Sequence, residues 1–255
     1  ERPEALENTN EILEAADGIM VARGDLGVEL NPEQVPVAQH QLIDLAREKF
    51  KPVIVATQML ESMIENARPT RAEVTDVAYA VTLGTDAIML SGETAVGSFP
   101  VDAVEMMDRI ARQTESYLWA QNVYGSKMKI GTGGKAIPIW DAVANSMSQL
   151  ARDLQVRAVV VISKSGMSAA TMSSARPAAP IIAITKSMDI CQKILMHWGI
   201  VPVFSEDAKE TDINNLARNV TVKKGLVSAG DKILLVQGFQ SDVALSKPSV
   251  TILTI

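Results

Sequence analysis

Short, wholly apolar segments that alternate with segments of helical length constrain the fold of this chain more than any other feature. In the first half we expect strands at 18–23, 51–57 and 86–90, and helices at 4–15, 32–50, 75–83 and 102–121. Strands that are apolar on both faces are typical of parallel sheets covered by helices on both sides. The pattern therefore predicts an α/β fold built from successive strand-helix units.

The alternation stops at a stretch rich in Gly and Lys, residues 125–138, and then resumes with shorter units. There we expect helices at 140–154, 167–175, 188–197 and 211–224, and strands at 157–163, 180–185, 200–204, 232–237 and 249–255. This second part is predicted to be a compact three-layer α/β domain with its own sheet. We predict domain boundaries of 1–121 for the first part, 122–138 for the linker and 139–255 for the second part.

Charge and composition limit the class of protein. Residues 1–118 hold 21 acidic against 9 basic side chains, whereas residues 119–255 hold 9 against 15. This division favours two domains with different partners: metal ions suit the acidic part, and a small anion suits the basic part better than nucleic acid does. Apolar runs fall far short of the roughly 20 residues that span a bilayer, so we expect no membrane partner. The single cysteine, Cys191, favours a cytoplasmic location.

Polar and small residues follow each apolar segment of the first part, and active sites of α/β folds gather at such carboxyl ends. Asp25 follows Gly24 directly after the first strand, and Thr57 ends the second. A carboxylate here suits Mg²⁺, which prefers hard oxygen ligands. Two structural alternatives stay open: Asp25 can cap a following helical turn, and the Thr57 hydroxyl can simply bond to backbone at the strand end.

A serine-rich segment of the second part has the features of a phosphate cradle. It follows an apolar strand and opens a helix, where backbone amides attract anions. The groups that would surround a phosphate belong to Ser163, Lys164, Ser165, Gly166 and Ser168. A serine-rich helix cap without a ligand is the alternative.

Long segments of the chain resemble pyruvate kinases in order and spacing. The resemblance is carried by DGIMVARGDLGVEL at 17–30, KPVIVATQMLESMIENARPTRAEVTDVA at 51–78 and GTDAIMLSGETAVGSFPVDAV at 84–104, and continues through SKSGMSAATMSSARPAAPIIAIT at 163–185 and GIVPVF at 199–204. It covers essentially the whole chain. The fold that it implies is the last part of a (β/α)-barrel, comprising three strand-helix units, followed by a three-layer α/β C-terminal domain.

The resemblance also implies a chemistry, phosphoryl transfer from phosphoenolpyruvate to ADP to give pyruvate and ATP. Glu1 and Asp25 fall on the family's metal-binding carboxylates, so they would hold Mg²⁺. The backbone amides of Gly24 and Asp25 fall where the family binds the substrate carboxylate, and Thr57 falls on the catalytic threonine beside the reacting carbons. The family further implies a K⁺ requirement, with K⁺ ligands outside this chain, and a homotetramer.

Ser163 to Ser168 resemble the family's effector site for phosphorylated sugars or nucleotides, but two features depart from it. Met167 stands where many members have arginine, and residues 237–249 lack the Gly and Thr pattern that closes over a sugar bisphosphate. A sugar-phosphate or nucleotide effector is therefore an open expectation for this site.

The resemblance implies that the chain begins two residues after the family's catalytic lysine and lacks the first five barrel strands. Three strand-helix units cannot close a barrel, so we expect the chain to be a fragment with negligible turnover by itself. One alternative is a non-catalytic module that binds sugar phosphates or nucleotides or forms oligomers. Another is a metal-dependent barrel of the aldolase type that handles pyruvate or phosphoenolpyruvate, although ATQMLESM at 56–63 and the appended domain favour pyruvate kinase.

Overall fold

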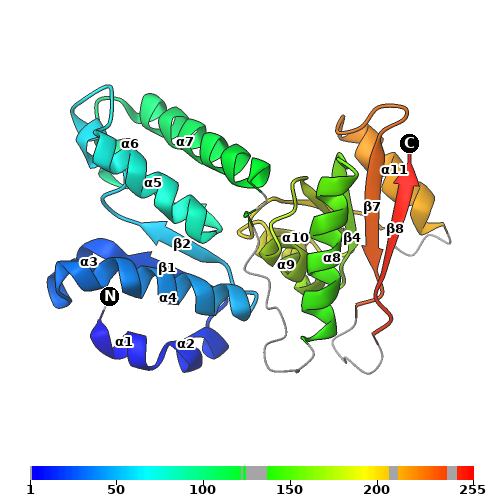
Figure 1. The fold of residues 1–255 in the computed structure, drawn as a ribbon, viewed down its shortest axis with the longest axis horizontal. Coiled ribbons are helices and arrows are strands. Elements are labelled where there is room, and N and C mark those ends of the chain that lie inside the picture. The colour runs from blue at the N-terminus through cyan, green and yellow to red at the C-terminus, as the bar shows by residue number, and fades with distance from the viewer. Residues whose placement is uncertain (1, 122, 125–136, 207–211, 240–245) are drawn as a thin grey trace. The chain divides into compact units, whose positions relative to one another are not determined.

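A computed structural model of the chain describes residues 2–121, 123–124, 137–206, 212–239 and 246–255. The chain divides into two compact units, Glu1–Tyr124 and Gly125–Ile255 (Figure 1). The linker expected at 122–138 lies mostly outside the described residues, as does Glu1.

A sheet of three parallel strands forms the centre of the first unit. Strands β1 (Ile19–Ala22), β2 (Val53–Ala56) and β3 (Ala87–Ile88) lie in the order β1-β2-β3. Its helices are α1 (Pro3–Glu7), α2 (Thr9–Ala15), α3 (Arg23–Glu29), α4 (Val35–Glu48), α5 (Arg71–Leu83), α6 (Gly92–Ala95) and α7 (Pro100–Ala120), with 3-10 turns at η1 (Pro32–Gln34) and η2 (Glu61–Ile64). The parallel α/β arrangement predicted for this part is confirmed.

Helices α4, α5 and α7 cover one face of this sheet. Val21, Val53 and Val55 of the strands are fully or almost fully buried there, in one apolar cluster with Ile43 of α4 and Val77 of α5. Met20 points to the opposite face and is 46% exposed. Within the described residues, the expected cover by helices is therefore complete on only one face of this sheet.

Several expected element boundaries in the first unit are wrong, and two of them lie near its start. The helix expected at 4–15 is divided at Asn8, whose Nδ2 donates to the Glu4 carbonyl at 2.9 Å. Asn side chains compete with the backbone for such bonds and so favour helix ends. The strand expected to reach Arg23 ends at Ala22, because α3 begins there directly. This change of backbone direction places Arg23 to Asp25 at the end of the sheet.

The second unit contains five strands in the order β6-β5-β4-β7-β8. They are β4 (Ala158–Ile162), β5 (Ile181–Thr185), β6 (Ile200–Phe204), β7 (Lys232–Gln237) and β8 (Ser249–Thr254), and the helices are α8 (Ile139–Asp153), α9 (Met167–Ser174), α10 (Met188–Ile194) and α11 (Ile213–Lys223). All the pairings are parallel except that of β7 with β8. The sequence between β7 and β8 is shorter than the dozen or so residues that a parallel crossover needs, and it returns the chain antiparallel.

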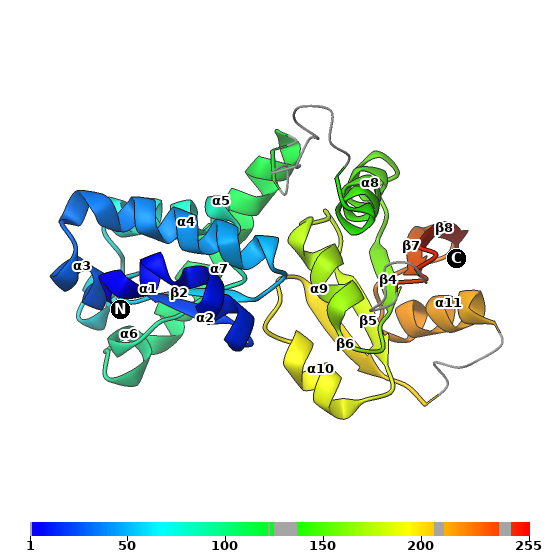
Figure 2. The ribbon, with the colours of Figure 1, turned by 90° about the horizontal axis from the view of Figure 1, so that it is seen from below.

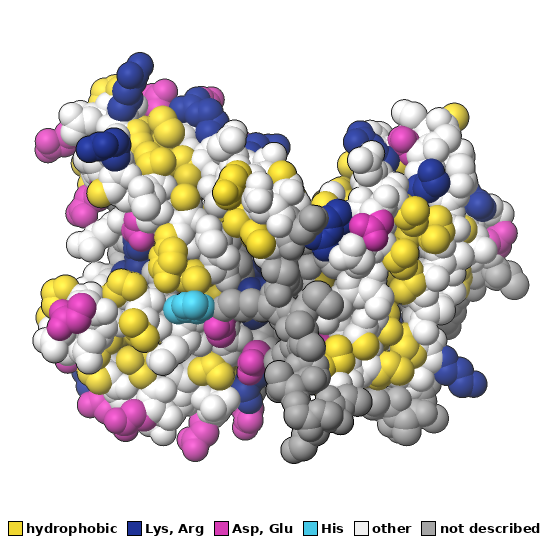
Figure 3. Space-filling view, in the orientation of Figure 1, with side chains coloured by type: hydrophobic (Ala, Val, Ile, Leu, Met, Phe, Trp, Pro, Cys, Tyr) yellow, Lys and Arg dark blue, Asp and Glu magenta, His cyan; other side chains and the backbone are white. Residues whose placement is uncertain are grey.

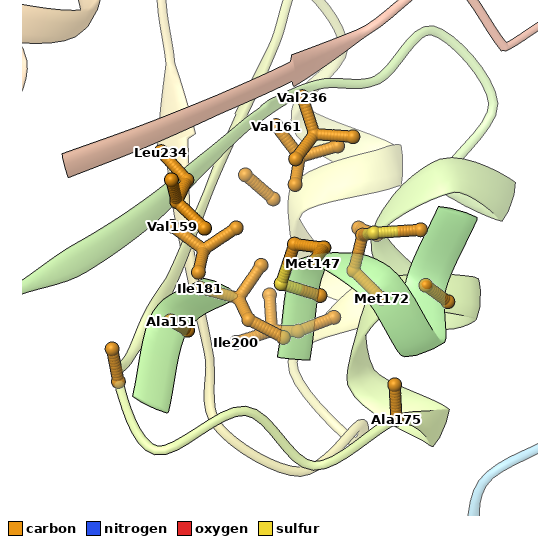
Figure 4. Packing of buried hydrophobic residues seen from close by; sticks show 14 of the residues in the cluster. Met147, Ala151, Val159, Val161, Met172, Ala175, Ile181, Ile200, Leu234 and Val236 are labelled. Carbon is orange, nitrogen blue, oxygen red and sulfur yellow. The ribbon is translucent and has the colours of Figure 1, made fainter. Parts of the chain in front are cut away.

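Helices cover both faces of the second sheet, as predicted for a three-layer domain. On one face, Met147 of α8 and Met172 of α9 pack against Val159, Ile181 and Leu234 (Figure 4). The other face packs against α11, which contributes two further buried residues, Leu216 and Ala217. Figure 2 shows α8 and α9 on one side of the strands and α11 on the other.

The surface of the first unit reflects its acidic composition. Exposed glutamates lie along α1 and α2, at Glu4, Glu7, Glu11 and Glu14, and acidic side chains gather over this lower part of the unit in Figure 3. No helix among the described residues combines the length and the apolar character needed to cross a membrane.

Candidate functional site

The candidate site lies where strands β1 and β2 end. Ala22 of β1 pairs in register with Ala56 of β2, so Arg23 and Thr57 follow at the same edge of the sheet. Carboxyl ends of parallel strands are where α/β folds place ligands. The structure thus brings together the residues that follow the first two strands, where the sequence predicts the site.

Arg23 is the central side chain of this edge, and only 10% of it is exposed. Its Nη2 donates to the carbonyl oxygens of Thr57 at 2.6 Å and of Gln58 at 3.2 Å, and its Nε donates to that of Ala56 at 3.4 Å. Its Nη1 forms an ion pair with the Asp76 carboxylate on α5. The role of Arg23 could not be read from the sequence, because its carbonyl and carboxylate partners lie more than 30 residues away.

Thr57 and Gln58 have left-handed backbone conformations, with φ of 66° and 53°. Residues with a side chain avoid this region, and each such residue costs about 1–3 kcal/mol, so the conformation persists only where surrounding contacts enforce it. The bonds from Arg23 fix the carbonyls of both residues. The Thr57 hydroxyl adds a further constraint, because it donates to the Ala56 carbonyl at 2.7 Å.

Gly24 joins the two strand ends directly. Its backbone amide donates to Thr57 Oγ1 at 2.8 Å, and a Cβ added at Gly24 would lie 3.4 Å from the same oxygen. That is an ordinary van der Waals distance, so this contact by itself does not require glycine. The Gly24 amide, which the resemblance implies for binding of a substrate carboxylate, is bonded within the protein here.

Asp25 lies in the first turn of α3 and is exposed. Its side chain makes no capping bond at the start of α3, where Ala22 is the N-cap residue, and its carboxylate accepts no hydrogen bond from the described residues. The capping alternative thus finds no support. A free carboxylate oxygen at a strand end fits Mg²⁺, which commonly uses one or two carboxylates together with substrate oxygens.

The second expected metal ligand, Glu1, lies outside the described residues. Among those that are described, no three His, Cys, Asp or Glu side chains gather closely enough to hold a metal ion. The residues present therefore fit a Mg²⁺ ion that takes Asp25 and completes its shell from other groups, rather than a site made wholly by this part of the chain.

Glu73 connects the turn after β2 to the start of α5. Its carboxylate accepts hydrogen bonds from the Ser62 amide at 2.7 Å and hydroxyl at 2.6 Å, and from the Thr70 amide at 2.7 Å and hydroxyl at 2.8 Å. Burial raises the pKa of Glu73, but these four bonds outweigh it and hold the pKa below its usual value. Thr70 and Glu73 form a capping box, so α5 begins at Arg71 rather than at the expected Thr75.

Glu93 is a second carboxylate whose role the sequence did not reveal. It is only 3% exposed, and it accepts bonds from the Leu60 amide at 3.1 Å and the Ser91 amide at 2.8 Å. Helix α6 begins directly after Ser91, whose side chain makes no capping bond. Glu93 instead connects α6 to the segment after β2, and this buried contact stabilises the segment that carries part of the site.

The serine-rich segment of the second unit lies between β4 and α9. Gly166 has a φ of 89° and is the N-cap residue of α9, and its amide donates to Ser163 Oγ at 3.1 Å. Ser163 and Ser168 are buried, whereas Lys164 and Ser165 are exposed. The structure therefore places four of the five expected residues in the loop and Ser168 in the first turn of α9, with Lys164 and Ser165 as the exposed pair.

These features define a class: an α/β chain of two units whose first unit gathers a cation, a carboxylate and a strained threonine at adjacent strand ends, as barrel folds do. Family models for the barrel domain and the alpha/beta domain of pyruvate kinase match residues 1–104 and 141–252. The chain belongs to the pyruvate kinase family, and its first unit is the last part of the family's barrel.

Comparison with individual proteins gives the same family. The chain is 42% identical over 239 residues to a pyruvate kinase of Sporosarcina psychrophila, and 39% identical over 245 residues to one of Clostridium acetobutylicum. A crystal structure of a pyruvate kinase from Cryptosporidium parvum, 35% identical, matches 97% of the chain with a TM-score of 0.80. The chain spans 40% and 51% of the two curated relatives and 49% of the solved chain, so it corresponds to about half of them.

Proposed function

We propose that the chain is the C-terminal part of a pyruvate kinase, which transfers the phosphoryl group of phosphoenolpyruvate to ADP. In this reaction the bond between phosphorus and the enol oxygen breaks, a bond to the terminal oxygen of ADP forms, and the enol carbon takes up a proton to give pyruvate. The observation that carries the proposal is the hydrogen bond from Gly24 to Thr57, since it joins the two family motifs at one edge of the sheet.

Each site residue has a role in this proposal. Asp25, together with Glu1, holds Mg²⁺, which would neutralise phosphate charge when bound. The amides of Gly24 and Asp25 bind the substrate carboxylate, which requires the Gly24 amide to exchange its bond with Thr57 for one with substrate. Thr57 lies beside the reacting carbons, where its hydroxyl orients the enol. The exposed Asp25 carboxylate and the position of Thr57 at the neighbouring strand end support these roles.

The rest of the active site belongs to the part of the family's length that this chain does not span. We propose that the remaining barrel strands supply the K⁺ ligands and the other phosphate-binding groups, and that the chain by itself has negligible turnover. We further propose residues 1–121 and 139–255 as the two domains, a cytoplasmic homotetramer as the complete protein, and no nucleic-acid or membrane partner.

The test is an assay of two polypeptides, the chain itself and the full-length product of its gene. An antibody against residues 140–255 first gives the size of the native product, which we expect to be about twice 27.4 kDa. The full-length protein should form ATP and pyruvate from phosphoenolpyruvate and ADP in the presence of Mg²⁺. Carbon-carbon cleavage without ATP formation would support an aldolase instead, and ligand binding without turnover would support a non-catalytic module.

We also propose that the loop from Ser163 to Ser168 binds the phosphate of a sugar-phosphate or nucleotide effector. The left-handed Gly166 at the start of α9 and the exposed Lys164 and Ser165 support this assignment. The buried bond between Ser163 and Gly166 shapes the loop, while the exposed pair would contact the ligand. Isothermal titration of the chain with a sugar bisphosphate tests this site independently of catalysis.

A further inference from the structure

We propose that Arg23, held by Asp76, is a positioning residue: it keeps Thr57 and Gln58 in their left-handed conformations and so directs the Thr57 hydroxyl toward the substrate site. This inference rests on the proposed function for its effect on the reaction. The structural part, that one guanidinium enforces the backbone after β2, stands on contacts within the described residues alone.

The carbonyl geometry is the first step. Along a β-strand, successive peptide groups point in alternating directions, so consecutive carbonyls cannot reach one donor. At the end of β2 the carbonyls of Ala56, Thr57 and Gln58 all accept bonds from Arg23. The chain achieves this convergence by turning through two left-handed residues. The guanidinium therefore binds the strained conformation and would lose bonds if the backbone relaxed.

Asp76 is the second step. Its carboxylate on α5 accepts a bond from Arg23 Nη1, while Nη2 and Nε face the carbonyls after β2. The carboxylate thus fixes the rotation of the planar group and balances its largely buried charge. A lysine could not replace this fork, because an ammonium group is a compact charge on a flexible stem.

The link to the reaction is the third step. The Thr57 hydroxyl donates to the Ala56 carbonyl and accepts from the Gly24 amide, so both its proton and one lone pair have fixed directions. Gly24 directly follows Arg23 in the chain, and both therefore move with the end of β1. Relaxation of Thr57 would turn its hydroxyl away from Gly24 and from the edge where the proposed substrate binds.

The first experiment uses the full-length protein and compares Arg23→Lys and Asp76→Asn with the control Arg112→Gln. Arg112 also pairs with an aspartate, Asp108, but on the exposed surface of α7. We expect kcat for ATP formation to fall about 10- to 100-fold in the first two variants, with KM for phosphoenolpyruvate little changed, because a misplaced catalytic group costs this much. The control should keep the rate of the unaltered protein.

A double-mutant cycle separates positioning from a general loss of structure. If Arg23 acts through the Thr57 hydroxyl, Arg23→Lys should change kcat little in a Thr57→Ala background. An equal fold-loss of kcat in both backgrounds would overturn the proposal. Should Arg23→Lys fail to fold, Asp76→Asn serves in the same cycle, because the Asp76 side chain is 35% exposed.

Hydrogen exchange gives a readout that does not depend on activity. In the chain itself, peptides covering residues 56–64 should exchange about tenfold faster in Asp76→Asn, while peptides from β4 and β5 stay unchanged. Unchanged exchange at 56–64 would overturn the structural part of the proposal. If the unaltered full-length protein forms no ATP but the exchange result holds, the proposed function fails and the role of Arg23 in shaping the backbone stands.

Discussion

The backbone amide of Gly24 donates a hydrogen bond to the hydroxyl oxygen of Thr57 at 2.8 Å. The two residues are far apart in the sequence, and the register between β1 and β2 brings them to one edge. The bond uses the two groups that the proposed reaction needs most, a substrate-binding amide and a catalytic hydroxyl. In the proposed reaction, binding of the substrate carboxylate would therefore break a hydrogen bond that is already formed in the free protein.

Thr57→Val should show how much the first unit depends on this bond. Valine has nearly the shape of threonine but cannot accept the Gly24 bond, so the amide would lose its partner, at a cost of about 1–3 kcal/mol in the free energy of unfolding. Thr57→Ser keeps the hydroxyl and is the matched control. Urea denaturation, monitored by hydrogen exchange of peptides within residues 2–121, measures the free energy of unfolding of both variants. A Thr57→Val protein as stable as the unaltered chain, with a loss confined to Thr57→Ser, would show that packing of the methyl group, and not the hydrogen bond, stabilises this edge.

Asp25→Ala should weaken the use of Mg²⁺ by the full-length protein. The variant removes one carboxylate ligand, so we expect both a higher Mg²⁺ concentration for half-maximal activity and a kcat lower by about 100-fold or more. Glu29→Ala is the matched control, since Glu29 is also an exposed acidic residue of α3. Titration of activity with Mg²⁺ makes the measurement. A near-normal titration curve for Asp25→Ala would remove Asp25 from the metal site.

Lys164→Ala should abolish activation by a sugar phosphate and leave the basal rate unchanged. The exposed ammonium group would supply the only side-chain cation of the expected loop, and its loss removes a charge-assisted contact with phosphate. Lys223→Ala makes the same change of charge on α11 and should behave like the unaltered protein. Rates of ATP formation by the two variants, measured with and without a sugar bisphosphate, test this prediction. Full activation of Lys164→Ala would leave the serine-rich loop as a helix cap.

The sequence predicted the order of elements well because each strand is marked by a short apolar run. Its errors lie at boundaries where a distant or capping contact decides the outcome. The helix at 4–15 divides because the Asn8 side chain bonds to the Glu4 carbonyl, and α5 starts early because Thr70 and Glu73 cap each other. The latter pattern, Thr followed three residues later by Glu, is a capping signal that can be read from the sequence.

The candidate site was predictable only in part. Family resemblance pointed to Gly24, Asp25 and Thr57, and the structure places all three at adjoining strand ends. Arg23 and Glu93 could not be assigned from local pattern, because Arg23 binds carbonyls at and after the end of β2 and Glu93 binds the Leu60 amide, far from it in the sequence. An arginine after a strand usually indicates solvent exposure. Only the folded arrangement shows that this one binds three consecutive carbonyls.

The capping carboxylate of Glu73 should make the stability of the first unit depend on pH. Because the pKa of Glu73 is lower in the folded chain than its usual value of 4.5, its stabilisation is fully present above about pH 4.5 and is lost as the pH falls through the folded pKa. Glu73→Gln should reduce the free energy of unfolding by about 1 kcal/mol at pH 7, the usual worth of a helix cap, and the two proteins should converge in stability toward pH 3. Glu61→Gln, an exposed glutamate of the same turn region whose side chain accepts no hydrogen bond from the described residues, controls for the change of charge. Urea denaturation at several pH values makes the comparison, and a difference between Glu73→Gln and the unaltered chain that stays constant from pH 7 to pH 3 would contradict an ionised cap.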